Sequence, residues 1–253
     1  MTPDLLILCA TLAEMSYFLS AHPPKAERMT RTGPRIFSGR LNGKAYDLMI
    51  TGPGVFNAAH ALTVYLEQAS PALVLQTGIA GVFRETGLDI GDVAVATGEQ
   101  YIHTGVASDS PLPGPLPFDL IEGLPSSREG RYAFDPDRVA ACHERLSSGF
   151  EHQGVRAARG PFITVSTLTS SFGQASRLHA ALSPVMEAME GAASAHIAAL
   201  YKVPFIEVRA ASNFTGERDK GKWDLERAAK HLGEACDHLM VMENRPLEET
   251  PWA

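Results

Sequence analysis

The sequence predicts an α/β fold, with a central mixed β-sheet flanked by helices in a single domain. Continuous apolar runs at residues 5–9 and 72–76 are typical of strands buried on both faces of a parallel sheet. Such runs alternate with segments of helical spacing along the chain. Asn42-Gly43 lies between two further strand-like runs and indicates an antiparallel hairpin. No repeat or linker divides the chain, so we expect one domain over residues 1–253.

The first half of the chain gives most of the predicted strands. Apolar runs and a hairpin turn predict strands, and apolar spacing of three and four residues predicts helices. The Pro23-Pro24 breaker ends the first helix, and the Gly52-Pro53-Gly54 turn precedes the second, which is rich in Ala and Leu. The predicted strands are 5–9, 35–39, 45–50, 72–76 and 92–97, and the predicted helices are 12–19 and 55–67.

The second half begins with a long excursion at residues 103–130, which carries five prolines and little periodicity. A loop of this length is typical of a lid, a binding loop or an interface arm. Asp135 is placed to cap the next helix, with Pro136 at its first position. Strands are predicted at 162–165 and 204–211, helices at 135–146, 189–201 and 223–242, and a loose tail at 244–253.

Composition excludes several classes of protein. The net charge is -7, and no run of basic residues could neutralise phosphates, so nucleic acid is not an expected partner. The first apolar run is of strand length, too short to cross a membrane, and no basic segment precedes it, so we expect a soluble cytoplasmic protein. Cys9, Cys142 and Cys236 lie far apart without a metal-ligand or redox spacing, which indicates buried free thiols.

Three polar side chains follow or end predicted elements and could meet in one cleft: Glu14, Glu190 and Asn213. In open α/β sheets, ligands bind where the carboxyl ends of strands gather. Two carboxylates and an amide suit a sugar and a base, and no ligand set for a metal is spaced around them. The Gly52-Pro53-Gly54 turn lacks the third glycine of a dinucleotide fingerprint, so we expect neither metal nor organic cofactor.

Each of these residues also has a simpler interpretation. Glu190 in the first turn of a helix is favoured by the helix dipole alone. Glu14 is also explained as an exposed acid in the first turn of its helix, and Asn213 as a turn cap. The residues of 78–81 are small enough to serve only close packing of a helix on a strand.

Six segments, spread in order over nearly the whole chain, resemble the nucleoside phosphorylase and nucleosidase superfamily, and in particular its 5'-methylthioadenosine/S-adenosylhomocysteine nucleosidase branch. They read ATLAEM (10–15), TGPGVFNAA (51–59), QTGIAG (76–81), IGDVAV (90–95), MEGAASAHIA (189–198) and VRAASN (208–213). The resemblance implies a nucleoside phosphorylase-like fold, a purine nucleoside substrate and a homodimer or higher homo-oligomer. Within the branch, Asn213 and GERDKGKW (216–223) are most similar to futalosine hydrolases of menaquinone biosynthesis.

The resemblance implies a role for each site residue. Glu190, with Met189 beside it, would bind the ribose hydroxyls, and Glu14 would activate the attacking water. Ile79, Ala80 and Gly81 would line the substrate site. Phosphorylases of the superfamily carry a serine or threonine in this turn, together with arginines; Ile79 has no hydroxyl, which favours hydrolysis, although Arg84 is close in sequence.

Asn213 departs from the branch pattern, in which enzymes acting on adenine nucleosides carry Asp. Its amide can donate to O6 and accept from a protonated N7 of a 6-oxopurine such as hypoxanthine. Ser212 would orient its neighbours or contact the base, and Phe172 would either stack on the base or belong to the core. Tyr101 or His103 would complete a neighbouring subunit's site, or be structural.

Futalosine is therefore the expected substrate, with Arg218, Lys220 and Lys222 either meeting its carboxylate or forming a solvated loop. Three alternatives stay open. A methylthioadenosine/S-adenosylhomocysteine nucleosidase is disfavoured by Asn213, and a 6-oxopurine phosphorylase is disfavoured by Ile79 and Glu14. A non-catalytic nucleoside-binding protein would not need both Glu14 and Glu190.

Overall fold

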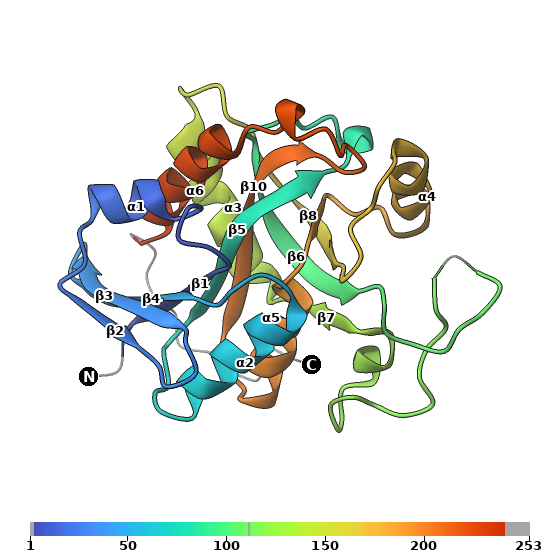
Figure 1. Cartoon of the computed structure of the whole chain (residues 1–253), viewed down its shortest axis with the longest axis horizontal. Coiled ribbons are helices and arrows are strands. Elements are labelled where there is room, and N and C mark those ends of the chain that lie inside the picture. The colour runs from blue at the N-terminus through green and yellow to red at the C-terminus, as the bar shows by residue number, and fades with distance from the viewer. Residues whose placement is uncertain (1–2, 111, 241–253) are drawn as a thin grey trace.

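Strands and helices alternate along most of the chain in the computed structural model, which describes residues 3–110 and 112–240 (Figure 1). The strands are β1 (Leu5–Cys9), β2 (Ala26–Met29), β3 (Arg35–Leu41), β4 (Lys44–Ile50), β5 (Val74–Val82), β6 (Val93–Tyr101), β7 (Arg131–Ala133), β8 (Ala157–Thr164), β9 (Met186–Ala188) and β10 (Phe205–Phe214). The helices are α1 (Ser16–Ala21), α2 (Val55–Leu66), α3 (Pro136–Phe150), α4 (Phe172–Leu182), α5 (Gly191–Leu200) and α6 (Leu225–Leu239). Short 3-10 turns are η1 (Arg84–Thr86), η2 (Pro125–Glu129) and η3 (Lys220–Lys222).

The strands form one mixed sheet in the order β10-β6-β8-β9-β5-β1-β4-β3-β2, with β7 beside β6. Because β10 also pairs with β5 along most of its length, the strands β10, β6, β8, β9 and β5 close into a ring. The remaining strands extend the sheet outward from β5 through β1. The predicted α/β fold with a central mixed sheet flanked by helices is confirmed.

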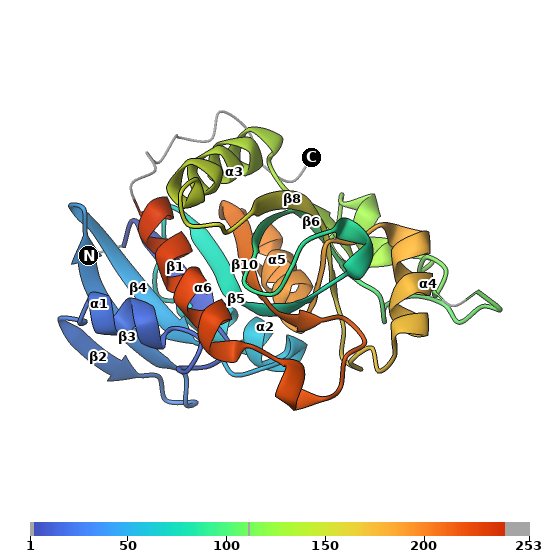
Figure 2. The same cartoon turned by 90° about the horizontal axis from the view of Figure 1, so that it is seen from above.

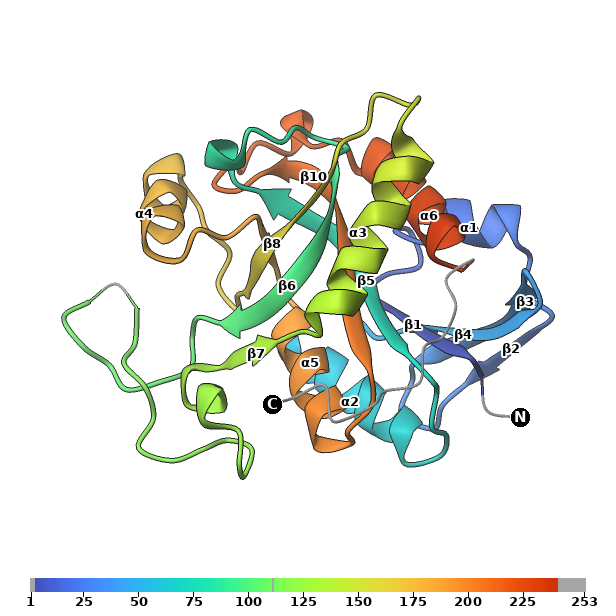
Figure 3. The ribbon, with the colours of Figure 1, turned by 180° about the vertical axis from the view of Figure 1, so that it is seen from behind.

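Helices cover both faces of this sheet. α2 packs against α5 on one face, and α6 lies between α1 and α3 on the other (Figures 1 and 2). From behind, α3 and α6 cross the strands of the ring, with α6 over β5 and β10 (Figure 3). Both faces of β5 and β10 are therefore buried along nearly their whole length.

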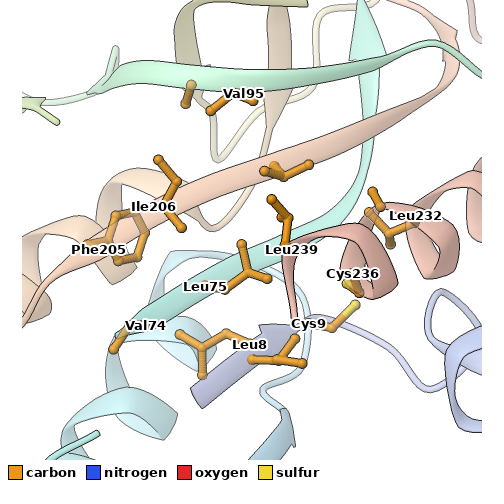
Figure 4. Packing of buried hydrophobic residues seen from close by; sticks show 14 of the residues in the cluster. Leu8, Cys9, Val74, Leu75, Val95, Phe205, Ile206, Leu232, Cys236 and Leu239 are labelled. Atoms are coloured by element: carbon orange, nitrogen blue, oxygen red, sulfur yellow. The ribbon is translucent and has the colours of Figure 1, made fainter. Parts of the chain in front are cut away.

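The core between α6 and the sheet is apolar (Figure 4). Leu232, Cys236 and Leu239 follow one another at helical spacing on α6 and pack toward Cys9 and Leu75 of the strands. Each fully buried leucine contributes about 1.5–3 kcal/mol through the hydrophobic effect. The three cysteines of the chain are free and buried, as predicted.

Two turn and cap predictions are confirmed. The β3–β4 hairpin turns at Asn42 (φ 52°) and Gly43 (φ 82°), and two positive φ angles in succession are what a two-residue hairpin turn of the right twist requires. Asp135 caps α3 by accepting hydrogen bonds from the N–H groups of Asp137 and Arg138, with Pro136 at the first helical position.

Residues 77–81 were predicted to be a turn after a strand at 72–76, which is wrong: β5 continues to Val82. Similarly, β10 runs beyond the predicted 204–211 and includes Asn213. The two strands extend together because they pair with each other throughout the ring, so the small residues of β5 keep both neighbours. β6 and β8 are also longer than predicted.

Two helix predictions require correction. Residues 12–15 form a turn, and α1 begins only at Ser16, because the Glu14 side chain bonds back to Thr11 and holds the turn. α5 begins at Gly191, so Glu190 is the residue before its first turn. The predicted helix at 223–242 is observed as α6; residues beyond 240, including the tail at 244–253, lie outside the described residues.

Some elements were not predicted. β2 is exposed at every position, β7 and β9 have three residues each, and α4 buries only Ala175, so none carries a clear apolar period. Residues 103–130 form the predicted excursion. Their described part holds one isolated bridge, between Val106 and Gly114, and η2. Among the described helices, none has the length and apolar character needed to span a membrane.

The hairpin offers a test of backbone against packing effects. Gly43→Ala should reduce the free energy of unfolding by about 1 kcal/mol, because Gly43 has positive φ while no atom lies within 4 Å of an added Cβ. Gly39→Ala should cost more, about 1–3 kcal/mol, because its Cβ would lie 2.5 Å from the buried Tyr46 ring. Urea unfolding measures both, and equal losses would contradict the packing argument.

Candidate active site

A cavity of about 380 Å³ lies where the carboxyl ends of β1, β5 and β10 meet the loops that follow them. This is the position at which α/β sheets bind ligands, and the volume is within the range of small-molecule sites. It brings together eight of the nine predicted site residues: Glu14, Ile79, Ala80, Gly81, Met189, Glu190, Ser212 and Asn213.

Glu14 lies at one end of the cavity and is almost wholly buried, with 7% exposed. Its Oε2 accepts hydrogen bonds from the N–H and the hydroxyl of Thr11, both at 2.7 Å. Its Oε1 accepts from the N–H of Ile79 at 3.1 Å, which ties the turn after β1 to β5. The interpretation as an exposed helix acid is therefore wrong: the carboxylate is fixed at the cavity wall by donors from two elements.

Glu190 reaches across to other elements in the same way. Its Oε1 accepts from the N–H of Gly54 at 2.9 Å, and its Oε2 accepts from Arg209 at 3.1 Å. It makes no side-chain cap bond to α5, but it lies at the N-cap of that helix, where the helix dipole also favours its charge. Gly52 and Gly54 both have positive φ, and this turn directs the Gly54 N–H at the carboxylate.

Arg209 anchors the floor of the site. Its side chain is fully buried and is held by Glu207 at 2.8 Å and by Glu190 at 3.1 Å. Burial alone would lower the pKa of this guanidinium, but the two carboxylates raise it above its ordinary value. Gly78 passes over the guanidinium, and a Cβ there would lie 2.6 Å from Nη1 and 3.1 Å from Glu14 Oε1. Arg209 therefore links the surroundings of Glu14 and Glu190.

A second carboxylate pair lies behind Arg209. Glu99 Oε1 and Glu207 Oε2 have no other hydrogen-bond partner, and both lie within 2.3 Å of the point that a Cβ on Gly191 would occupy. Burial raises the pKa of Glu99 well above its ordinary value, and the neighbouring Glu207 raises it further. Glu207 is stabilised as an anion by Arg209. Burial also raises the pKa of Glu207, and Arg209 opposes that shift. We therefore expect Glu99 to be the protonated member of the pair and to donate to Glu207.

Asn213 owes its position to a β-bulge. In the β10–β5 pairing, Ala211 lies opposite Ala80 and Asn213 lies opposite Gly81, so Ser212 is the extra residue. A bulge changes the face toward which the following side chains point, and both Ser212 and Asn213 line the cavity as a result. Ser212 donates to Asn213 Oδ1 at 2.8 Å, and Asn213 Nδ2 donates to the carbonyl of Phe214 at 3.0 Å.

Glu187 and Thr215 are among the cavity residues that were not predicted. Glu187 of β9 lines the cavity and accepts hydrogen bonds from the N–H of Thr169, at 3.1 Å, and from its hydroxyl. Burial raises the pKa of Glu187, while the Thr169 hydrogen bonds and the Arg218 charge oppose the shift. The hydroxyl of Thr215 is buried in the lining and has no hydrogen-bond partner.

Other predicted residues lie outside the lining. Phe172, expected as a base-stacking residue, has its ring 3.5 Å from the Arg84 guanidinium, and neither residue reaches the cavity. Tyr101 and His103 both bond to Ser166 away from it. Of the three basic residues expected near the substrate carboxylate, only Arg218 lines the cavity. Lys222 pairs with Glu217, and Lys220 lies in η3.

The sequence contained a pattern from which Glu207 and Arg209 could have been predicted. Glu207 and Arg209 lie two residues apart in the buried strand β10, and oppositely charged residues at this spacing predict a buried ion pair on one face. Glu187 had no such signal because β9 is too short to show a pattern. Among the described residues, no cluster of three or more His, Cys, Asp or Glu side chains could hold a metal ion.

The Glu99–Glu207 pair predicts a pH-dependent stability. A carboxyl group whose pKa is raised by folding favours the folded state fully at low pH, and this contribution is lost as pH rises through the folded-state pKa. Glu99→Gln keeps a neutral donor to Glu207. The free energy of unfolding of this variant, minus that of the wild type, should therefore be larger at about pH 9 than at about pH 6. The expected increase is about 1 kcal/mol or more.

Urea unfolding at the two pH values measures this difference. Glu27→Gln, an exposed member of the Glu27–Arg35 pair on the sheet edge, is the matched control and should show no such trend. Equal effects of Glu99→Gln at both pH values would contradict the protonated assignment.

The 5'-methylthioadenosine/S-adenosylhomocysteine nucleosidase of Bacillus subtilis (strain 168) is 30% identical over 200 residues, covering 78% of this chain and 81% of that protein. The enzyme of the same name from Actinobacillus succinogenes is 29% identical over 208 residues, covering 82% and 84%.

Two solved structures share the fold. The nucleosidase of Neisseria meningitidis, in complex with methylthio-immucillin-A, superposes with a TM-score of 0.79 at 22% identity, covering 93% of this chain and 97% of that one. Futalosine hydrolase of Helicobacter pylori superposes with a TM-score of 0.78 at 19% identity, covering 95% and 98%. At these identities the likeness concerns the fold. The family model of the phosphorylase superfamily matches residues 4–240, and the chain therefore belongs to the phosphorylase superfamily.

Proposed function

We propose that the protein hydrolyses the N-glycosidic bond of a purine nucleoside, and that the nucleoside is futalosine, giving hypoxanthine and dehypoxanthine futalosine. The observation that carries this proposal is the cavity itself, in which two buried carboxylates from different elements, Glu14 and Glu190, share one space with the amide of Asn213. Such a set provides one group each for water, sugar and base.

Glu190 is suited to the sugar. Arg209 and the N–H groups of Gly54 and Met189 hold its carboxylate. Arg209 and Met189 both donate to Oε2, and Oε1 keeps one lone pair that can accept a hydrogen bond from a ribose hydroxyl. As the base leaves, positive charge develops on the ribose ring. A carboxylate already fixed beside the ring stabilises this charge without having to reorganise.

Glu14 is suited to the nucleophile. Its carboxylate is held by Thr11 and Ile79, so a water on its open side is positioned by a rigid acceptor. In the proposed step, N7 of the base takes up a proton from solvent, the water oxygen bonds to C1′, and the C1′–N9 bond breaks. Its bonding pair leaves with the base, which departs as neutral hypoxanthine protonated at N7. The proton lost by water passes to Glu14, a general-base role.

Water is a better nucleophile than phosphate in this cavity. Phosphate needs several cationic or hydroxyl donors directed at one point. Arg218 is the one Lys or Arg side chain of the lining residues, and Ile79 provides no hydroxyl on β5. Arg209 is committed to Glu207 and Glu190 beneath the floor.

The amide of Asn213 favours a 6-oxopurine. Ser212 and the Phe214 carbonyl fix its orientation, and they leave one N–H and one lone pair of Oδ1 available. The N–H can donate to O6 and the lone pair can accept from N7–H of the departing base. Arg218, which lies over the Trp223 ring at the cavity wall, is available for a substrate carboxylate such as that of futalosine.

A second candidate is hydrolysis of methylthioadenosine or S-adenosylhomocysteine. Relatives that carry that name are 27–30% identical to this chain. The candidates differ in the base released, which makes them simple to separate.

Base release in phosphate-free buffer tests the proposal directly. Futalosine, inosine, methylthioadenosine and S-adenosylhomocysteine are incubated in parallel, and the products are separated by chromatography. We expect hypoxanthine from futalosine. Glu14→Gln should lower kcat/KM by at least about 100-fold, since a general base contributes 10²–10⁴ in rate. Glu27→Gln, on the far edge of the sheet, should leave it unchanged. Adenine release would establish the second candidate, and activity on inosine only with added phosphate would indicate a phosphorylase.

Asn213→Asp tests the role of the amide. A carboxylic acid at this position can donate a proton to N7 of adenine, whereas the asparagine amide cannot. The ratio of kcat/KM for methylthioadenosine to that for futalosine should therefore rise at least about tenfold, because a site whose polar groups mismatch the substrate loses orders of magnitude. An unchanged ratio would show that Asn213 does not select the base.

A further inference from the structure

Gly81 lies between two polar residues on neighbouring strands. In the register of the sheet, Gly81 of β5 is paired with Asn213 of β10 on one side and with Glu187 of β9 on the other. Residues directly opposite one another project on the same face of a sheet. With a strand spacing of about 4.8 Å, the Cα atoms of Asn213 and Glu187 are about 10 Å apart. All three residues line the cavity.

The space above Gly81 has no side chain of its own but is bordered by polar atoms. A Cβ at Gly81 would lie 2.9 Å from Thr215 Oγ1 and 3.4 Å from Asn213 Nδ2. The Thr215 hydroxyl is buried and without a hydrogen-bond partner. A buried hydroxyl left unpaired costs free energy, so a ligand group that pairs with it is stabilised there.

Glu187 is held ready on the other side. Thr169 donates its N–H to one carboxylate oxygen and its hydroxyl to the other. Burial raises the pKa of Glu187, and both bonds oppose this shift by favouring the ionised form. They leave one lone pair free on each oxygen. Glu187 belongs to β9, which is one of the five strands of the closed ring, so its backbone is held by the sheet.

We propose that Glu187 and Thr215 bind the pyrimidine-ring edge of a 6-oxopurine over Gly81: the Glu187 carboxylate accepts a hydrogen bond from N1–H, and the Thr215 hydroxyl donates to O6. Asn213 faces N7 and O6 from the opposite side. This assignment rests on the proposed function for the presence of a purine in the cavity, and it adds the residue that selects the base. Adenine carries a lone pair at N1, which the carboxylate would repel, so Glu187 excludes adenine independently of Asn213.

The competing explanation is that Glu187 only holds the loop at Thr169. If Glu187 only held this loop, replacing it would change the affinity for all bases equally. If it accepts a hydrogen bond from N1–H, the affinity depends on whether N1 of the base carries a hydrogen. Hypoxanthine, 1-methylhypoxanthine and adenine separate the two, because methylation removes N1–H and keeps O6 and N7. Binding of the free bases can be measured by calorimetry and needs no turnover.

The wild type should bind hypoxanthine at least about tenfold more tightly than either 1-methylhypoxanthine or adenine, the expected effect of one hydrogen bond to a charged group. Glu187→Gln should weaken hypoxanthine binding by about tenfold to 100-fold and should bind adenine more tightly than the wild type does, since its NH₂ can donate to N1. Thr169→Val keeps the backbone bond to Glu187 and should retain the preference for hypoxanthine. Glu85→Gln, an exposed carboxylate bonded to Ser176 outside the cavity, is the matched control and should behave as the wild type.

Several outcomes would overturn the proposal. Equal binding of hypoxanthine and 1-methylhypoxanthine by the wild type does so without any variant, and so does Glu187→Gln with unchanged relative affinities. If the wild type binds no purine, both this proposal and the proposed function fail. If it binds hypoxanthine with the expected selectivity but does not cleave futalosine, the base-binding role of Glu187 stands and only the futalosine assignment is lost.

Discussion

The site depends on one buried cation. Arg209 has no exposed surface and lies on β10 among Glu207, Glu190 and the Gly78 backbone. An isolated charge in such a place would be prohibitively unstable, and a pair broken by loss of one partner typically costs about 3–5 kcal/mol. Because the partners of Arg209 come from β10 itself and from the start of α5, while β5 passes directly over it, the ion pair determines how these three elements meet.

This arrangement also sets the charge of the cavity. Burial and the neighbouring Glu207 raise the pKa of Glu99 behind Arg209. Glu207 and Glu190 share the positive charge of Arg209. One guanidinium therefore stabilises the buried acids without cancelling the charge at the cavity surface, where Glu14 and Glu190 are presented. A pocket of this kind favours a ligand that becomes more positive during the reaction, and it disfavours anionic nucleophiles.

Prediction from sequence worked where a local pattern reflects a local cause. The hairpin at Asn42-Gly43, the Asp135 cap and the buried runs of β1 and β5 are specified by residues close together in the chain. The convergence of Glu14, Glu190 and Asn213 was also predictable, because the carboxyl ends of parallel strands gather at one edge.

What could not be predicted depends on pairing between distant segments. The extension of β5 and β10 requires each strand as partner of the other, and the bulge at Ser212 exists only relative to Ala80 and Gly81. The position of Glu187 beside Gly81 follows from the antiparallel pairing of a three-residue strand with β5.

The closed ring of β10, β6, β8, β9 and β5 has a kinetic consequence. An open sheet can fray from an edge, but these five strands each have partners on both sides. Their amide hydrogens should accordingly be exchanged with solvent only in the rarest, most global openings of the molecule. The cavity cannot then admit or release a molecule by separating its floor. Ligand entry and release therefore depend on the segments outside the sheet that border the cavity. These are the turn at Thr11–Glu14, the stretch at Leu168 and Thr169, and the loop from Gly216 to Trp223. The rate of ligand exchange and the geometry of the reacting groups are thus governed by different parts of the chain, and either can change in evolution without the other.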